Sequence, residues 1–130
     1  MREVLDRTLA AVNADQSVGP LIQATGLRMG IECPDVKGVV QVAASREPGS
    51  YIEWRFDRRT PRKPKLVLLM DSDVANEWLQ GRVSVPMAIA HRRMTSSGEA
   101  RSALLYLPAV KLISSAYRRV ISSGYSHLAL

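Results

Sequence analysis

Apolar residues near the start of the chain recur at the spacing of an α-helix. Leu5, Leu9 and Val12 fall on one helical face, while the charged residues between them fall elsewhere. A stripe of this kind docks on a core, so the sequence predicts an amphipathic helix that ends soon after Val12. Ser17 is placed to cap a second, short helix, and Gly26 is placed to stop it. Two helices therefore precede the first strand.

After these helices the period of the apolar positions changes to two, which is typical of strands with one buried face. The alternation predicts three strands, over residues 27–33, 40–44 and 52–56. Short turns rich in Pro and Gly join them, so an antiparallel meander with one face in water is expected. The predicted buried face consists of Leu27, Met29, Ile31, Cys33, Val40, Val42, Ala44, Ile52, Trp54 and Phe56.

The second half of the chain alternates between the two periods. A fourth strand is predicted over residues 66–70, followed by a helix over residues 71–81 whose acidic start suits the helix dipole. A Pro-led helix over residues 86–92 and a fifth strand around residues 94–96 come next. Beyond Pro108, apolar residues again recur at helical spacing, so Pro108 either kinks a helix or starts a new one.

These elements predict one α+β domain over residues 1–130. Its expected architecture is a five-stranded, mainly antiparallel sheet covered on one face by several helices. Residues 1–26 would form the N-terminal helices, residues 27–107 the sheet and central helices, and residues 108–130 a C-terminal helix. A chain of 130 residues buries roughly two-thirds of the surface that it exposes when unfolded. That is enough for a core.

The cysteine content argues for a reducing, cytoplasmic location. Cys33 is the only cysteine, so neither an intrachain disulfide nor a zinc site built from thiolate pairs can form. We interpret Cys33 as a small buried hydrophobe, because no histidine lies near it in the sequence. Charges recur every few residues through MREVLDRTLAAV, so no signal peptide is expected there, and no apolar run approaches the length of a membrane span.

The net charge of +6 is concentrated in the basic loop, residues 58–65 with the sequence RRTPRKPK. A field of this sign favours anionic partners, such as nucleic-acid phosphates or a lipid surface. The simpler interpretation is a solvated loop between two strands, broken by its two prolines. Binding of a polyanion through this loop is therefore kept as an alternative function, and nucleic acid is not the expected partner.

The sequence contains no motif with a catalytic or cofactor-binding rationale. A phosphate-binding loop, a dinucleotide fingerprint, a nucleophile elbow and a zinc helix are all missing. His91 lies beside two arginines and His127 lies near the end of the chain, so neither has an orienting partner. Asp71, Asp73 and Glu77 are better explained by helix capping and solvation than by metal binding. We expect no catalytic residue, no metal ligand and no cofactor.

The apolar side chains of the central region suggest a binding cavity. Trp54 and Trp78 are each most simply explained as core residues, yet either could line a cavity between the helices and the sheet. Flexible apolar residues converge on the same region from several elements, which suits adaptable binding of an apolar ligand. This set consists of Met70, Trp78, Leu79, Met87, Ile89, Met94 and Leu104.

A series of short motifs runs from Leu66 to Leu107. It comprises LVLLMD, VANEWL, Gly81-Arg82, Val85-Pro86-Met87, Ser97-Gly98-Glu99 and ALLYL. In this order and spacing the series resembles the sterol carrier protein type 2 (SCP2) superfamily, and a weaker likeness extends back to about Leu21. The chain departs from the family pattern before and within the last strand. It has Arg92-Arg93 where many members have Gly-Lys, and Ser96 where members place an apolar residue.

The resemblance implies a small lipid-carrier domain with an apolar tunnel or cavity between its sheet and its helices. It implies binding or carriage of a fatty acid, fatty acyl-CoA, sterol or other lipid without covalent chemistry. Arg92 or Arg93 would meet the headgroup of the ligand. The apolar part would contact Trp54, Phe56, Met70, Trp78, Leu79, Met87, Ile89, Met94 and Leu104.

Other expectations are less specific. The protein would be a monomer or a homodimer, and it would touch anionic membrane surfaces transiently. The segment beyond Pro108 would form a lid or pack on the outside of the domain. A further alternative, ranked lowest, makes the same cavity the pocket of a small enzyme or an accessory domain, because a fold does not fix a function.

Overall fold

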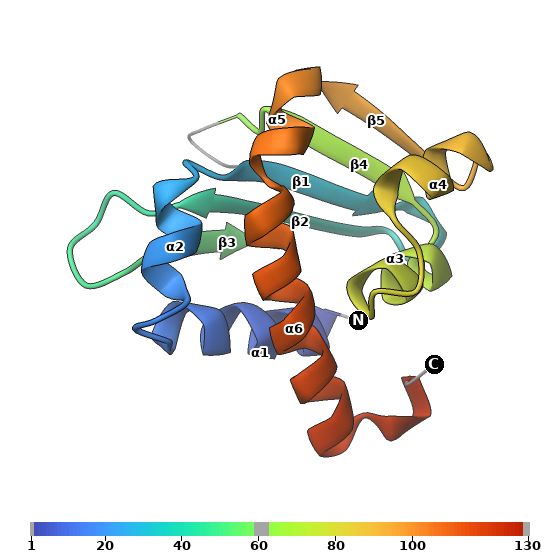
Figure 1. Ribbon diagram of the computed structural model, residues 1–130. Coiled ribbons are helices and arrows are strands. Elements are labelled where there is room, and N and C mark those ends of the chain that lie inside the picture. The colour runs from blue at the N-terminus through green and yellow to red at the C-terminus, as the bar shows by residue number, and fades with distance from the viewer. Residues whose placement is uncertain (1, 59–62, 129–130) are drawn as a thin grey trace.

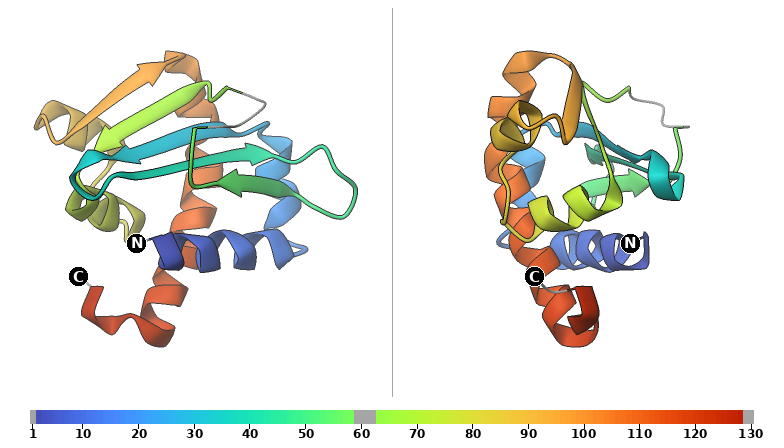
Figure 2. Two further views of the ribbon diagram at one scale, coloured as in Figure 1. Left: turned by 180° about the vertical axis from the view of Figure 1, so that it is seen from behind. Right: turned by 90° about the vertical axis from the view of Figure 1, so that its right-hand side faces the viewer.

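The computed structural model describes residues 2–58 and 63–128, which form a sheet with helices on one side (Figures 1 and 2). The elements in chain order are α1 (Arg2–Ala14), α2 (Gly19–Ala24), β1 (Arg28–Cys33), the 3-10 helix η1 (Pro34–Val36), β2 (Gly38–Ala44), β3 (Ile52–Arg55), β4 (Leu66–Met70), α3 (Ser72–Leu79), α4 (Val85–Ala90), β5 (Met94–Gly98), α5 (Ala100–Leu105), α6 (Leu107–Gly124) and the 3-10 helix η2 (Ser126–Leu128). The α+β class is confirmed.

The described residues form a five-stranded sheet in the order β3-β2-β1-β4-β5. The pairs β1–β2, β2–β3 and β4–β5 are antiparallel, whereas β1–β4 is parallel. The predicted mainly antiparallel sheet is therefore confirmed. The parallel pair arises because the chain crosses from the edge strand β3 to the far side of β1 before it forms β4.

The alternation predicted for the strands places the core on the helix side of the sheet. Met29, Ile31 and Cys33 of β1 are buried there, as are Leu66 and Leu68 of β4. Gly98 closes β5 where φ is +113°, and a Cβ atom at that position would lie 2.1 Å from the main-chain oxygen of Lys65. Only glycine fits this close approach.

The C-terminal helix is part of the core. Pro108 lies in the first turn of α6, so it starts a new helix rather than kinking one. Helix α6 runs across the helical side and crosses α1 (Figure 1), and Tyr117 on its inner face is 0% exposed. The expectation that this segment packs outside the domain is wrong, because its apolar stripe faces the sheet and α1.

One predicted helix cap is also wrong. Ser17 does not cap α2, whose N-cap position is held by Val18 without a side-chain hydrogen bond. The Oδ1 atom of Asp15 accepts hydrogen bonds from the backbone N–H groups of Ser17 and Val18 at 2.9 and 3.1 Å. The turn after α1 brings this carboxylate to the amides that Ser17 was expected to serve. None of the helices in the described ranges is long and apolar enough to cross a membrane.

Candidate ligand-binding cavity

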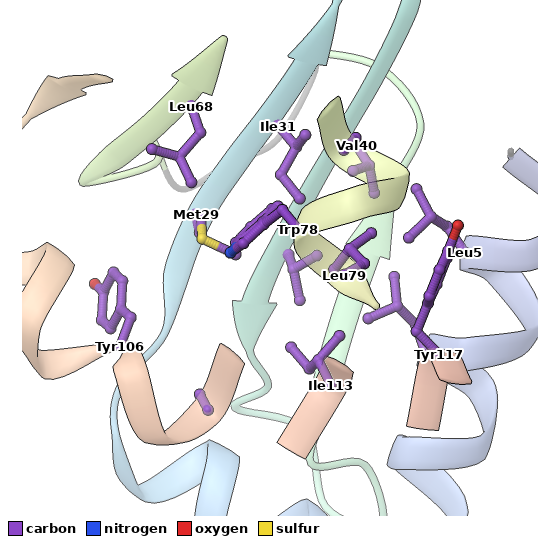
Figure 3. Close-up of a cluster of buried hydrophobic side chains, with 14 of the residues drawn as sticks. Leu5, Met29, Ile31, Val40, Leu68, Trp78, Leu79, Tyr106, Ile113 and Tyr117 are labelled. Atoms are coloured by element: carbon purple, nitrogen blue, oxygen red, sulfur yellow. The ribbon is translucent and has the colours of Figure 1, made fainter. Parts of the chain in front are cut away.

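A cavity of about 440 Å³ lies between the helix side of β1 and β2 and the helices α1, α3 and α6. Its inner wall is apolar, with Leu5 from α1, Ile31 and Val40 from the sheet, and Leu79 from α3 (Figure 3). The side chains reach it through their spacing, since alternate strand residues share a face and helical residues four apart share one. The volume falls within the usual range of small-molecule pockets, roughly 300–1,000 Å³.

The apolar wall continues deeper into the protein. A second void of about 20 Å³ is lined by the same Leu5, Ile31, Val40 and Leu79, together with Trp78 and other core residues. Trp78 is 5% exposed and belongs to the buried core. Figure 3 shows its ring beside Met29. The small void therefore lies between the cavity wall and the buried Trp78 side chain.

A hydrogen-bonded cluster forms the polar side of the cavity. The hydroxyl group of Tyr117 donates to Oδ1 of Asn76 over 2.6 Å. The amide nitrogens of Asn76 and Gln80 donate to the main-chain oxygen of Leu128 over 2.9 and 2.8 Å. Burial raises the pKa of Tyr117 to about 12, so its hydroxyl remains a donor at neutral pH. These bonds hold η2 against α3, where Leu128 lines the cavity.

The mouth of the cavity carries two cations. Arg2 and Lys37 both line it, and the guanidinium carbon of Arg2 lies 4.7 Å from the centroid of the Phe56 ring. Lys37 has a φ of +52° at the end of η1. Asp73 is an acidic residue at the same mouth. An anionic group there would meet the positive charges of Arg2 and Lys37, with the carboxylates of Asp73 and of Asp35, which is bonded to Ser72, nearby.

Asp35 fixes the geometry of this mouth. Its Oδ2 atom accepts a hydrogen bond from the Ser72 hydroxyl at 2.6 Å, and its Oδ1 atom accepts one from the Ser72 N–H group at 3.0 Å. The bond from the Ser72 side chain is the main reason why the pKa of Asp35 is lowered. The sequence predicted that residues 71–73 would cap α3 themselves, but Asp71 at the N-cap makes no such bond. Asp35 caps the helix from η1 instead.

Cys33 lies in the wall of the cavity but is poorly suited to nucleophilic chemistry. Its side chain is buried, and desolvation raises the pKa of the thiol to about 11, with smaller effects from Asp35 and Asp71. Thiolate is therefore scarce at neutral pH. Within residues 2–58 and 63–128, no three side chains of His, Cys, Asp or Glu come together in a way that could hold a metal ion.

Part of the predicted binding set lies at the cavity. Phe56 and Leu79 line it, and Trp78 lines the inner void. Trp54 does not line it; the side chain packs partly buried against the core, and its Nε1–H group donates to Oδ1 of Asp6 over 2.9 Å. These four residues come from the strand and helix that the sequence pattern identified most clearly.

The other predicted contacts lie elsewhere. Met70 and Met94 pair across β4 and β5 and are buried in the core. Met87, Ile89 and Leu104 lie on the surface, and Leu104 is 72% exposed. None of these five residues lines the cavity described above, and their contact with a ligand stays a prediction. Helical spacing reveals an apolar face but not what covers it, and the residue that α4 buries is Ala88.

The predicted headgroup residues are also away from the mouth. Arg92 is exposed in the turn after α4, and Arg93 pairs with Oε2 of Glu77 at 2.6 Å. Neither lines the cavity. The cations at the mouth, Arg2 and Lys37, were missed because each is a lone charge beside a turn or a chain end. Only the fold brings them together.

Two described residues of the basic loop, Arg58 and Pro64, contact the other face of the sheet. Pro64 packs over Gly30 of β1, since a Cβ atom at Gly30 would lie 3.5 Å from Cγ of Pro64. Arg58 forms an ion pair and hydrogen bond with Glu32. Arg59 and Arg62 lie outside the described residues. Pro64 and Arg58 thus contact residues of β1 on the face of the sheet away from the helices.

Comparisons with known proteins identify the fold. No protein-family model matches the chain, and no curated protein is significantly similar to it. Among solved structures, the chain aligns with the sterol carrier protein domain 2 of Helicoverpa armigera at a TM-score of 0.62, with 13% identity over 87% of each chain. The chain has the SCP2 fold. The resemblance seen in the sequence is confirmed at the level of the fold.

Two further structures show how the SCP2 fold is used at different scales. A UbiJ-SCP2 ubiquinone synthesis protein matches at a TM-score of 0.62, with 9% identity over 88% of each chain. The inverting sec-alkylsulfatase Pisa1 from Pseudomonas sp. matches at a TM-score of 0.57 with 11% identity. That alignment covers 81% of this chain but only 14% of Pisa1, so the matching region is a small part of that enzyme.

Proposed function

We propose that this protein binds and carries an amphipathic lipid, with the apolar tail in the cavity and an acidic headgroup at the mouth. The observation that carries the proposal is the combination of an apolar wall, built by Leu5, Ile31, Val40 and Leu79, with a mouth lined by Arg2 and Lys37. The SCP2 fold of proteins described as sterol carriers supports it. A sterol remains a candidate for the same walls.

Burial of a tail supplies enough free energy without any reacting group. Each buried CH₂ group contributes about 0.8 kcal/mol, so a tail of about ten methylenes gains about 8 kcal/mol before the costs of binding are subtracted. The cavity of about 440 Å³ shares Leu5, Ile31, Val40 and Leu79 with the small inner void, so movement of these side chains would join the two and lengthen the chamber. Affinity in this scheme comes from the walls, and selection among headgroups comes from the mouth.

A carrier without enzymatic activity is the form of the proposal that the side chains favour. The nucleophile nearest to a bound tail would be Cys33, whose raised pKa of about 11 opposes attack at neutral pH. The hydroxyl of Tyr117 is engaged with Asn76. A cytoplasmic location and transient contact with anionic membranes stay predictions.

The first experiment identifies the ligand. The protein is purified under native conditions, its mass is measured with and without denaturation, and an organic extract is analysed by mass spectrometry. We expect a co-purified lipid with one acidic group and an unbranched tail. An empty protein that also fails to bind added fatty acids and sterols would contradict the proposal.

A pair of variants tests the location. Val40→Phe projects a larger side chain into the cavity, whereas Val67→Phe enlarges a half-buried residue on the other face of the sheet. We expect Val40→Phe to abolish lipid binding and Val67→Phe to retain it. Binding is followed by the fluorescence of Trp78 in a Trp54→Phe background, so that one indole reports. Equal binding by both variants would place the ligand elsewhere.

The polyanion alternative is carried by the basic loop alone. Arg58 is already paired with Glu32, which weakens the loop as a phosphate-binding surface. This alternative predicts an affinity for DNA or RNA that falls steeply with salt concentration. Binding that is absent or insensitive to salt would remove it.

A further inference from the structure

The two edges of the sheet are treated differently by the chain. At the β3 edge, Oδ1 of Asn13 accepts hydrogen bonds from the N–H groups of Tyr51 and Ile52 at 2.8 and 3.0 Å, and Trp54 donates to Asp6. Helix α1 thus fastens that edge. Proteins usually protect edge strands with charges, proline, bulges or a covering element. β3 has such protection.

The β5 edge lacks these devices in the described part of the chain. Its sequence, MTSSG, has neither a charge nor a proline, and its register with β4 runs without a bulge from Met94 to Gly98. Thr95, Ser96, Ser97 and Gly98 are all exposed. Such an edge is a template for another strand.

The hydrogen-bonding pattern shows which backbone groups of β5 point outward. Glu99 N–H donates to the main-chain oxygen of Lys65 over 2.9 Å, so Glu99 belongs to a hydrogen-bonded pair with Lys65. Hydrogen-bonded and non-bonded pairs alternate along an antiparallel ladder. Thr95 and Ser97 therefore direct their backbone groups to β4, while Met94, Ser96 and Gly98 direct theirs to the edge.

Exposed apolar side chains flank both ends of this edge. Helix α4 precedes β5 and exposes Met87 and Ile89, and α5 follows β5 and exposes Leu104 and Leu105. Figure 1 shows the two helices at opposite ends of the strand. In an antiparallel pair of β5 strands, the start of one strand lies beside the end of the other. Each end of the pair therefore brings α4 of one copy beside α5 of the other.

We propose that a second copy of this chain pairs its β5 with this β5 to form a two-fold homodimer with a continuous ten-stranded sheet. Centring the two-fold axis on Ser96 brings Met94 opposite Gly98, so the outward backbone groups of one copy meet those of the other. The same register brings Arg93 opposite Glu99 of the second copy. A closed, isologous contact of this kind satisfies both edges at once.

Charge complementarity follows from that register. Arg93 already pairs with Glu77 at 2.6 Å, and an arginine with five N–H donors can hold a second carboxylate. Glu99 is exposed, with the Ser102 hydroxyl 3.3 Å from its Oε2 atom as a neighbour. Opposite charges facing each other stabilise a strand pair, and like charges destabilise it. Helix α1 and the C-terminal end, which supply cavity-lining residues, lie away from β5 (Figure 1), so the dimer would leave the mouth uncovered.

The test begins with sedimentation equilibrium of the native chain over a range of concentrations. We expect a monomer–dimer equilibrium. Ser96→Glu places two carboxylates face to face on the two-fold axis and should weaken the dimer about tenfold or more. The control is Ser97→Glu, one residue along, which meets Thr95 rather than itself and should retain the dimer. Far-UV circular dichroism checks that both variants fold.

A charge exchange tests the register by complementation, and because Arg93 also pairs with Glu77 within one copy, circular dichroism again checks that each variant folds. Arg93→Glu and Glu99→Arg each create like-charged pairs in their own homodimers, so each should be monomeric. An equimolar mixture restores both opposite-charge pairs and should form a heterodimer. A monomeric native chain at millimolar concentration overturns the proposal, as does a dimer that Ser96→Glu leaves intact. A mixture that stays monomeric overturns the Ser96-centred register. If the native chain is monomeric and binds anionic vesicles through Leu104 and Met87, the exposed apolar side chains of α4 and α5 serve membrane contact instead, and the dimer is overturned.

Discussion

Tyr117 and Asn76 join the C-terminal helix to α3 through a hydrogen bond of 2.6 Å beside the cavity. Tyr117 is 0% exposed, and the same Asn76 oxygen accepts a second hydrogen bond, from Nε2 of Gln80 at 2.7 Å. Asn76 in turn reaches the backbone of η2. One amide group therefore couples the longest helix, the cavity wall and the end of the described chain.

Replacing Tyr117 with phenylalanine should lower stability while the ring keeps its packing. The substitution removes one buried hydrogen bond, for which a loss of about 1 kcal/mol in the free energy of unfolding is expected. Urea denaturation followed by circular dichroism measures it. Tyr106→Phe is the matched control, because Tyr106 is also buried and also lies on the helical side. Equal losses of stability in the two variants would mean that the hydrogen bond to Asn76 makes no measurable contribution to the free energy of unfolding.

The same variant carries a pH signature. The pKa of Tyr117 is raised from 10.0 to about 12 in the folded chain, so its contribution to stability is complete below about pH 10 and is lost as the pH rises toward 12. Native protein should lose stability across this window more steeply than Tyr117→Phe. Cys33, raised from 9.0 to about 11, acts in the same direction and is present in both proteins. Parallel curves would contradict this account.

The thiol of Cys33 should report on occupancy of the cavity. Because its pKa is about 11, native protein should react with iodoacetamide at pH 8 much more slowly than denatured protein does. A lipid in the cavity should slow the reaction further, since Cys33 lines the wall. Intact mass spectrometry over time measures both rates. Labelling that is fast and unaffected by lipid would contradict the placement of the ligand.

Charge removal at the mouth should separate headgroup recognition from tail burial. The double variant Arg2→Gln/Lys37→Gln is expected to weaken binding of a fatty acid by about tenfold, corresponding to about 1.4 kcal/mol, with little effect on an uncharged alcohol of the same length. Arg92→Gln is the control, because Arg92 does not line the cavity. A loss of affinity with Arg92→Gln alone would restore the headgroup site suggested by the sequence. Titration calorimetry measures the affinity of the native protein, the double variant and Arg92→Gln for each ligand.

The sequence predicted the sheet better than the cavity. Alternation over residues 27–33 and 40–44 identified the buried strand faces, because that pattern is local and one-sided. The parallel pairing of β1 with β4 depends on how the chain returns from β3, which no local pattern encodes.

The cavity itself depends on distances between elements. Leu5, Ile31 and Val40 were predicted to be buried, yet nothing in their spacing distinguishes residues that meet a neighbour from residues that face a void. Met87 and Leu104 have the same apolar character and end on the surface, since no described element covers α4 or α5 there. The spacing of apolar residues along a helix predicts an apolar face, but only the fold determines whether that face is buried, lines a cavity or stays exposed.

The hydrogen bonds that fasten η2 end on the main-chain oxygen of Leu128 rather than on its side chain. Any amino acid at position 128 offers the same acceptor. The fastening is therefore indifferent to the size of that side chain, while the side chain itself lines the cavity. Substitutions at position 128 can therefore change the size of the ligand chamber without removing the hydrogen bonds that hold η2 against α3.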